Sequence, residues 1–268
     1  MAVLSRSMAA DSALIRHLRR ELRAAADPVR APQMRAYMKS TMPYYGIAST
    51  PLRAICRGVF DAHPLPSFEA WRDTVLELWR GASHREERYA AVALTGHRLY
   101  SEYQVLEALP VYEEMVVTGA WWDLVDGVAT GRLRGLLERY PREMRRAMLA
   151  WSRSEDMWKR RAAILCQVGR RLDVDTDLLQ RCIAPNLGDR EFFIRKAIGW
   201  ALRDYAWHDP AWVRQYVSQN VSKLSSLSRR EASKNLDKAL TKVSRGAHTM
   251  SASSTPGKPG RSPDSSAS

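Results

Sequence analysis

The chain of 268 residues is 45% hydrophobic and 26% charged, and its 14 glycines and 13 prolines are too few for a collagen-like or wholly disordered protein. Its 42 lysines and arginines exceed its 29 aspartates and glutamates, which leaves a net charge of +13. Such a charge favours a polyanionic partner, with nucleic acid first and an anionic membrane surface second; a basic protein without such a partner stays open, because net charge does not determine fold.

The N-terminal segment contains charges at Arg6, Asp11, Arg16 and Arg19, so it lacks the continuous apolar core of a signal peptide. No apolar run in the chain approaches the roughly 20 residues that a membrane span needs. The three cysteines show no CxxC spacing, so the sequence indicates neither a disulfide framework nor a zinc site. We therefore expect a cytoplasmic protein that needs no metal or other cofactor.

Helical periodicity extends over almost the whole chain. Apolar residues recur at helical spacing in stretches such as HREERYAAVALTGHRL, whereas the alternation typical of strands is scarce. Helix starts are indicated by Thr50 before Pro51, by Ser67 before FEAWRDTVLELW, and by Asp209 before a proline. We predict an all-α protein of roughly a dozen helices joined by short turns.

Three segments repeat at nearly constant spacing. WDLVDGVA begins at Trp122, WKRRAAIL at Trp158 and FIRKAIGW at Phe193, which are spacings of 36 and 35 residues. A period of this size in a helical chain indicates stacked helical pairs of the HEAT or armadillo kind. The predicted architecture is a superhelical array of HEAT-like repeats with a concave basic groove.

The helical pattern stops at about Gly246. The stretch AHTMSASSTPGKPGRSPDSSAS is rich in serine, glycine and proline and has little to bury. We therefore predict one helical repeat domain over residues 1–245 and a disordered tail over residues 246–268.

The common catalytic motifs are absent. The sequence contains no HExxH, Walker loop, GxSxG or dinucleotide-binding glycine pattern. The HRE that begins at His84 matches the first part of the zinc deaminase signature, but no PCxxC follows. A metal enzyme is therefore not indicated.

The stretch GAWWDLVDGVA combines two tryptophans and two aspartates. On a helix Trp122 and Asp126 share one face, whereas Trp121 and Asp123 point elsewhere. Tryptophans in helical repeats are commonly core residues, and Asp123 could cap a helix, so a purely structural interpretation stays open. An acid beside a DNA groove repels phosphates, so chemistry explains Asp126 more readily than binding does.

If successive repeats present equivalent faces, Asp126 is joined on one surface by Arg161 from the next repeat and by Trp200 or Lys196 from the one after. These residues would form a basic groove that has an aromatic floor and contains one acid.

Five stretches carry a resemblance to a known family: MRAYMKSTMPYYGIASTPLR, WWDLVD, MWKRRAAIL, REFFIRKAIGWALRDYA and LSSLSRREASKNL. Together, over about residues 34–238, they resemble the DNA alkylation repair glycosylase family (AlkD-like), whose members are HEAT-like repeat enzymes that excise alkylated purines. The resemblance implies a monofunctional glycosylase that acts as a monomer. It would hydrolyse the N-glycosidic bond of cationic N7- or N3-alkylated purines in duplex DNA and be associated with the nucleoid.

The resemblance also implies roles for single residues. It places the family's groove tryptophan and aspartate at Trp122 and Asp126, its groove arginine at Arg161 and its second groove tryptophan at Trp200. The family's N-terminal tyrosine falls on Tyr37, Tyr44 or Tyr45, of which we favour Tyr37. Arg160 and Lys196 are expected as further DNA contacts.

In the implied mechanism the cationic base leaves readily, so the enzyme acts on the sugar. Asp126 would stabilise the oxocarbenium-like transition state and orient water. Trp122 and Trp200 would offer π faces to the sugar and the lesion, and Arg161 would hold a phosphate. Two alternatives stay open: a non-catalytic helical-repeat protein that binds damaged or branched nucleic acid and has no use for Asp126, and a protein-interaction scaffold.

Overall fold

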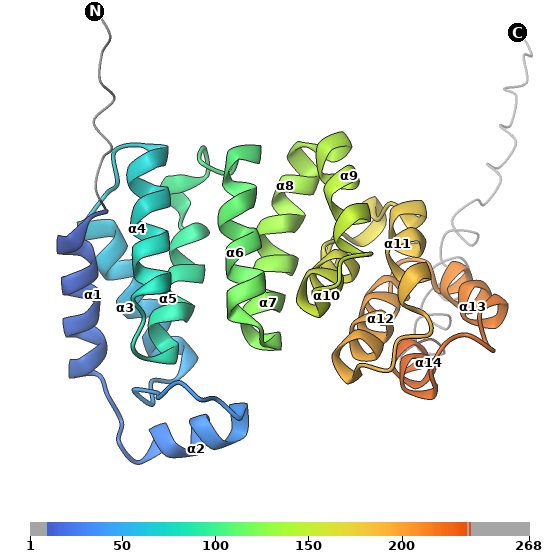
Figure 1. Cartoon of the computed structure of the whole chain (residues 1–268), viewed down its shortest axis with the longest axis horizontal. Helices are drawn as coiled ribbons and strands as arrows, with labels where there is room; N and C mark the ends of the chain where they lie inside the picture. Colours follow the sequence, from blue (N-terminus) through green and yellow to red (C-terminus); the bar gives the residue numbers. More distant parts are fainter. Residues whose placement is uncertain (1–9, 235, 237–268) are drawn as a thin grey trace, which may run out of the picture.

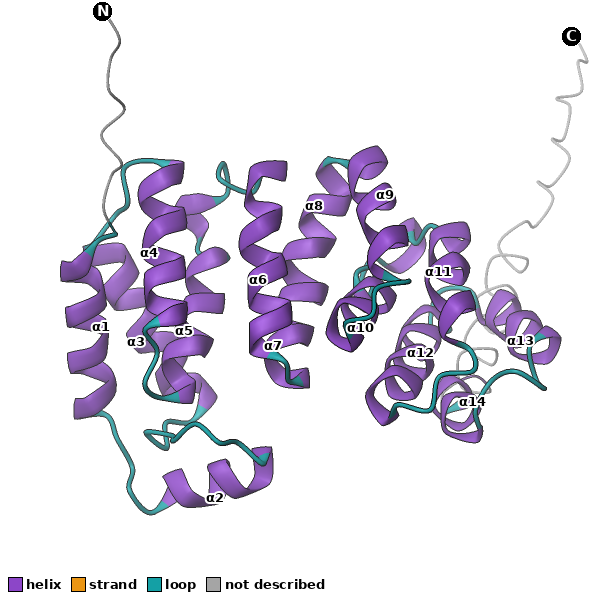
Figure 2. Cartoon of the chain, viewed as in Figure 1, coloured by secondary structure: helices purple, strands orange, loops and turns teal. Residues whose placement is uncertain are grey.

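The computed structural model describes residues 10–234 and 236, and within these residues the chain is all-α and contains no strand (Figures 1 and 2). Short turns and single 3-10 turns join the helices. The α-helices are α1 (Ser12–Ala24), α2 (Arg30–Met38), α3 (Ser49–Ala62), α4 (Phe68–Arg80), α5 (Arg85–Thr95), α6 (Leu109–Gly119), α7 (Trp122–Gly127), α8 (Arg134–Arg139), α9 (Pro141–Trp151), α10 (Met157–Leu165), α11 (Thr176–Ile183), α12 (Phe192–Tyr205), α13 (Pro210–Gln219) and α14 (Ser226–Ser233).

The helices form two layers that follow the long axis of the molecule (Figure 1). One layer contains α1, α4, α6, α9 and α11, and the other contains α3, α5, α7, α10 and α12. Each of these helices contacts neighbours in its own layer or in the opposite layer. One continuous cluster of buried apolar side chains extends from Leu14 to Leu236 between the layers. A single core of this kind is expected of a repeat array in which each unit packs on the next.

The repeated segments lie at equivalent places in the array. Trp122 is the first residue of α7, Trp158 the second of α10 and Phe193 the second of α12. The sequence period therefore marks the starts of three helices in one layer. The all-α class and the helical repeat array are confirmed, whereas the concave basic groove stays a prediction.

Two of the predicted helix starts are confirmed. The Ser67 side chain caps α4 by accepting the backbone N–H of Ala70, and Asp209 caps α13 by accepting that of Trp212. The start predicted at Thr50 is wrong by two residues, because α3 begins at Ser49 after Ala48. Proline fits anywhere in the first turn of a helix, since the first N–H groups have no intrahelical partner, so it does not mark one position.

Helix α2 is held apart from the two layers by anchors at both of its ends (Figure 1). The buried carboxylate of Glu86 accepts the backbone N–H groups of Tyr45, Gly46 and Ile47 at 2.8–3.2 Å. The backbone N–H of Asp27 donates to the carbonyl of Tyr45 at 2.8 Å. Gly46 has a φ of +88°, and a Cβ there would lie 2.2 Å from the Asp27 carbonyl oxygen, so only glycine permits this close approach.

The domain boundary predicted at residue 245 and the tail predicted over residues 246–268 lie outside the described residues. In the part of the chain that is described, every helix is too short or too polar to cross a membrane. The three cysteines are buried and form no disulfide.

Candidate active site

Helix α7 takes its position from the turn that precedes it. Ala120 adopts a left-handed conformation with a φ of +42° and ends α6, and the extended Trp121 is the N-cap residue that precedes α7. A Cβ on Gly119 would lie 3.2 Å from the Trp79 ring, so the small residue lets α6 end close against that core tryptophan. The six-residue α7 continues into a π-helical turn, residues 128–133, an irregularity often found at functional sites.

Asp126 forms an ion pair with Arg161 that joins α7 to α10. Arg161 Nε donates to Asp126 Oδ1 at 2.7 Å and Nη2 donates to Oδ2 at 2.8 Å, so the guanidinium holds both carboxylate oxygens. Arg161 Nη1 donates to the Phe193 carbonyl oxygen at 2.5 Å, which ties the pair to α12. The Arg161 side chain is 4% exposed and that of Asp126 is 14% exposed. The arginine is thus enclosed, while the carboxylate keeps an edge in solvent.

The environment of Asp126 opposes its negative charge. Burial raises the pKa of the Asp126 carboxyl above its ordinary value, against the hydrogen bonds and charge of Arg161, which lower it, and the nearby Asp123 raises it further. The carboxylate has therefore exchanged much of its water for a single arginine. A cation that approaches its exposed edge is consequently stabilised more than it would be beside a solvated acid.

An aromatic cluster packs around this ion pair. The ring centroids of Trp121, Trp158 and Phe193 lie 5.1–6.2 Å apart, and the Arg161 guanidinium carbon lies 5.9 Å from the Phe193 ring centroid. The indole Nε1 of Trp121 is buried without a hydrogen-bond partner among the described residues. The cluster limits access of water to the enclosed arginine.

Trp122 and Trp200 occupy intermediate environments. Both are half-buried and pack against the core cluster, so each ring has one buried part and one accessible part. Trp122 lies one helical turn before Asp126 on α7, and Trp200 lies on α12, which packs against α10. This arrangement is compatible with both the core and the groove interpretation of these residues.

The second aspartate of α7 forms a separate ion pair with α5. Arg85 donates to Asp123 through Nη2 at 2.5 Å and Nε at 3.3 Å, and the Tyr89 hydroxyl donates to Oδ2 at 2.5 Å. The backbone N–H of Leu124 also donates to this carboxylate. The expectation that Asp123 and Asp126 point in different directions is confirmed. Asp123 does not occupy the N-cap position, which belongs to Trp121, but its carboxylate binds a first-turn N–H of α7 as well as Arg85, so the structural interpretation of Asp123 is supported.

The remaining predicted DNA contacts form interactions within the protein. Lys196 Nζ lies 2.8 Å from Glu231 Oε1, and Arg160 donates to Asp189 at 3.0 Å and to two carbonyl oxygens. Although burial raises the pKa of Glu231, hydrogen bonds from Lys196 and Lys234 lower it to about 2. Tyr37 lies on α2 and is 79% exposed. The structure thus brings Asp126 and Arg161 together and leaves the DNA contacts as predictions.

Sequence analysis missed three parts of the arrangement. The Phe193 carbonyl that receives Arg161 leaves no signal in the sequence, because any residue has a carbonyl. Arg85 lies in the HRE stretch, where the sequence indicates a helix but no partner for the arginine. Tyr89, which donates to Asp123, lies in the same helical stretch, and its spacing there gives no sign of a hydrogen bond to a distant carboxylate.

The chain is similar to proteins linked to DNA repair. The sequence pattern of the family described as DNA alkylation repair enzyme matches residues 18–236. A solved structure, described as a predicted DNA alkylation repair enzyme from Enterococcus faecalis, is 28% identical in sequence with a TM-score of 0.71. The similarity covers 78% of this chain and 95% of that one. No curated protein matches the chain.

Proposed function

Because the chain belongs to the DNA alkylation repair enzyme family, we propose that it is a DNA glycosylase that hydrolyses the N-glycosidic bond of cationic N7- or N3-alkylated purines in duplex DNA. Membership of the family gives the DNA repair role and makes DNA the partner. The glycosylase chemistry rests on one observation, the carboxylate of Asp126 held by both of its oxygens in the fork of Arg161.

The proposed reaction needs a fixed negative charge rather than a general acid. A purine alkylated at N7 or N3 is already cationic and leaves without protonation. As its bond to the sugar breaks, positive charge develops on the deoxyribose, as in other glycoside cleavages. An enclosed carboxylate with an exposed edge stabilises this charge without having to reorganise. Such preorganised electrostatic stabilisation is the largest single contribution to the rate enhancement of many enzymes. Asp126 meets this requirement.

Asp126 also has free acceptor capacity for the attacking water. A carboxylate offers about four lone-pair sites, and Arg161 occupies one on each oxygen. The remaining sites accept a hydrogen bond from water, which positions the nucleophile beside the sugar. The proposed role of Asp126 is therefore both electrostatic and orienting.

The geometry favours a positioning role for Arg161 over the phosphate contact expected from the sequence. Nε, Nη1 and Nη2 all donate within the protein, and the side chain is almost fully enclosed. A guanidinium in this state keeps the carboxylate in one rotamer and opposes its protonation. Trp122 and Trp200 would offer their accessible faces to the sugar and the cationic base.

The direct test is release of free base from a duplex that contains a single N7-methylguanine. Incubation with excess protein should release N7-methylguanine, detected by mass spectrometry, and leave an abasic site. The same duplex incubated without protein gives the rate of spontaneous loss, and an unmodified duplex checks the specificity. Release no faster than the spontaneous rate would leave the non-catalytic DNA binder as the better interpretation.

A further inference from the structure

A cleft that encloses about 520 Å³ lies between α3 and the C-terminal part of α5. Three arginines line it: Arg53 and Arg57 belong to α3, and Arg98 follows α5. All three side chains are exposed, so their guanidinium groups are free to turn towards a ligand. The cleft is separate from Asp126, which lies on α7.

The positive charge of this cleft is only partly compensated. Arg53 and Arg57 lie four residues apart on one face of α3, and like charges at this spacing destabilise a helix. Among the residues that the structure describes, neither arginine forms an ion pair or a hydrogen bond. The acid beside them, Asp61, binds Arg98 at 2.8 Å. A bound anion would therefore relieve a repulsion that the protein alone leaves in place.

A neutral ring underlies the three cations. The His97 side chain is 9% exposed, and its ring packs edge-on against Phe60 with the centroids 5.5 Å apart. Burial lowers the pKa of His97, as do the charges of Arg98 and Arg57, while Asp61 raises it. His97 therefore supplies an uncharged and poorly hydrated wall. Walls of this kind strengthen the field of the charges that line a cleft.

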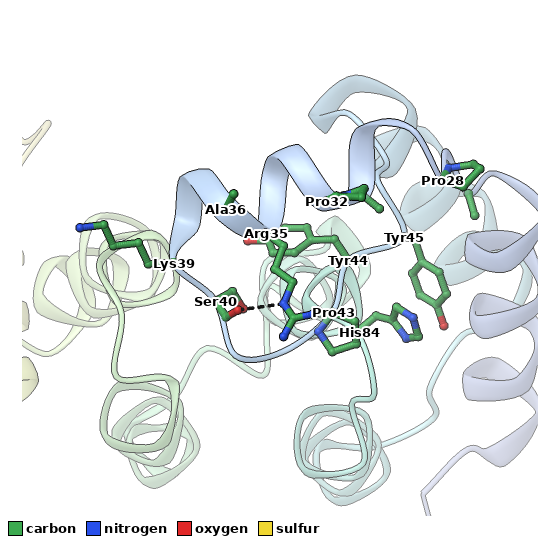
Figure 3. A pocket seen from close by; sticks show the side chains of 12 residues that line it. Pro28, Pro32, Arg35, Ala36, Lys39, Ser40, Pro43, Tyr44, Tyr45 and His84 are labelled. Carbon is green, nitrogen blue, oxygen red and sulfur yellow. Dashed lines mark hydrogen bonds between the residues drawn. The ribbon is translucent and has the colours of Figure 1, made fainter.

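The arginine of a second cleft, between α2 and the start of α5, is in a different state (Figure 3). The Arg35 guanidinium donates to the carbonyl oxygens of Ser40 and Thr41 at 3.2 and 3.3 Å, which ties it to the turn after α2. Its donors are thus engaged within the protein. The guanidinium groups of Arg53 and Arg57 keep their donors for a ligand.

The cleft lies in the helix layer that carries Asp126. Helix α3 packs against α5, and α5 packs against α7. Neighbouring packed helices are about 8–10 Å apart, so the cleft lies on the order of 15 Å from α7. About four to five base pairs of duplex DNA span this distance, at roughly 3.4 Å for each pair. A duplex bound at Asp126 therefore reaches the cleft with the backbone that flanks the lesion.

From these observations we infer that the cleft between α3 and α5 binds a phosphate group, which the backbone of duplex DNA supplies beside the lesion. Phosphate fits because guanidinium groups donate to its oxygens in pairs and its charge compensates theirs. Free phosphate has the same chemistry, so the test must distinguish the two sources. The inference rests on the DNA-binding part of the proposed function but not on the chemistry at Asp126.

The test is the salt dependence of binding to an unmodified duplex, from which no base is released. In the double variant Arg53→Gln, Arg57→Gln the affinity should fall about fivefold or more, and the log–log slope should flatten by about 0.9 because one phosphate is no longer neutralised. The matched control is Arg142→Gln, Arg146→Gln, two exposed arginines at the same spacing on α9 in the opposite layer. It makes the same change in net charge and should alter the slope by less than about 0.3.

Ala93→Glu is a second variant that acts on the same cleft. Ala93 is exposed on α5 and lines the cleft, so a glutamate there places a carboxylate where the phosphate would bind. Duplex affinity should again fall about fivefold or more. Melting curves should show that all the variants fold, because every substituted side chain is exposed.

Inorganic phosphate at constant ionic strength measures the other source. An unchanged slope in the α3 variant, together with a melting temperature that phosphate raises in the parent and not in that variant, would keep the site and assign it to free phosphate. The inference is overturned if neither effect occurs, or if the α9 control flattens the slope as much as the α3 variant. Release of N7-methylguanine by the parent, measured separately, reports on the proposed function alone.

Discussion

Helix α7 contains two aspartates three residues apart, each bound by an arginine from a neighbouring helix, yet the two carboxylates differ in their remaining capacity. Asp123 accepts four hydrogen bonds, two from Arg85 and one each from Tyr89 and the Leu124 backbone. Asp126 accepts two, both from Arg161, among the residues that the structure describes. A carboxylate offers about four acceptor sites, so the first is saturated and the second is not.

This difference supports the proposed assignment of a structural role to Asp123 and a chemical role to Asp126. The similar enclosure of the two side chains, 11% exposed for Asp123 and 14% for Asp126, would not distinguish them. The number of unused lone pairs does, because water and a developing sugar cation need an oxygen that is still free to interact. Substitutions in each ion pair test this difference between the two carboxylates.

The largest effect is expected from Asp126→Asn. The change keeps the shape of the side chain and removes its charge, so single-turnover release of N7-methylguanine should fall by about 10²-fold or more, or about 2.7 kcal/mol of transition-state stabilisation. DNA affinity should persist or increase slightly, because a group that repels phosphates has lost its charge. An unchanged rate would remove Asp126 from the chemistry.

Asp123→Asn is the control for this experiment. Both substitutions leave a largely buried arginine without its counter-charge, so each should destabilise the fold, by on the order of 3 kcal/mol. Measured well below the melting temperature, Asp123→Asn should change the excision rate by no more than about threefold. If both variants lose activity equally, the contrast between the two acids is wrong and α7 acts as one unit.

A smaller effect is expected from Arg161→Lys. A lysine ammonium keeps the charge but cannot hold both oxygens of Asp126 or reach the Phe193 carbonyl at the same time. Excision should fall by about tenfold because the carboxylate is less well oriented, while duplex affinity changes little. Loss of affinity with an unchanged rate in bound DNA would instead support the phosphate contact.

The pH dependence of excision tests the environment of Asp126. Burial raises the pKa of this carboxyl above its ordinary value of 3.8, so the excision rate should be half-lost on acidification at a pH above 3.8. Since the folded protein binds this proton more readily than the unfolded chain, the contribution of Asp126 to stability should increase as pH falls through the same range. Rates are corrected for spontaneous base loss at each pH, and a midpoint at or below 3.8 would contradict the assignment.

The smallest effect concerns salt. Duplex affinity should fall steeply with salt concentration, with a log–log slope of about −0.9 for each phosphate neutralised. Because the donors of Arg161 are bound to Asp126 and Phe193, Arg161→Ala should alter this slope by less than about half a unit. A slope flattened by about 0.9 would return Arg161 to direct contact with DNA.

Local patterns in the sequence determined the helices and their order. Ser67 and Asp209 mark helix starts because a cap forms between a side chain and a backbone N–H only a few residues away. The period from Trp122 to Trp158 to Phe193 marked the array, since each repeat must bury the same face. The family could likewise be recognised in linear stretches, and the pattern match over residues 18–236 confirms it.

The partners of the charged side chains depend on how the helices pack and could not be read from the sequence. Asp126 meets Arg161 across 35 residues and Asp123 meets Arg85 across 38, and both choices depend on how α7 packs between α5 and α10. Spacing along one helix places two acids on its surface but does not say which neighbouring helix supplies a guanidinium. The sequence therefore indicated which residues are candidates for chemistry. Packing of the helices sets how many hydrogen bonds each carboxylate accepts, because hydrogen bonds between distant segments form only when the layers meet.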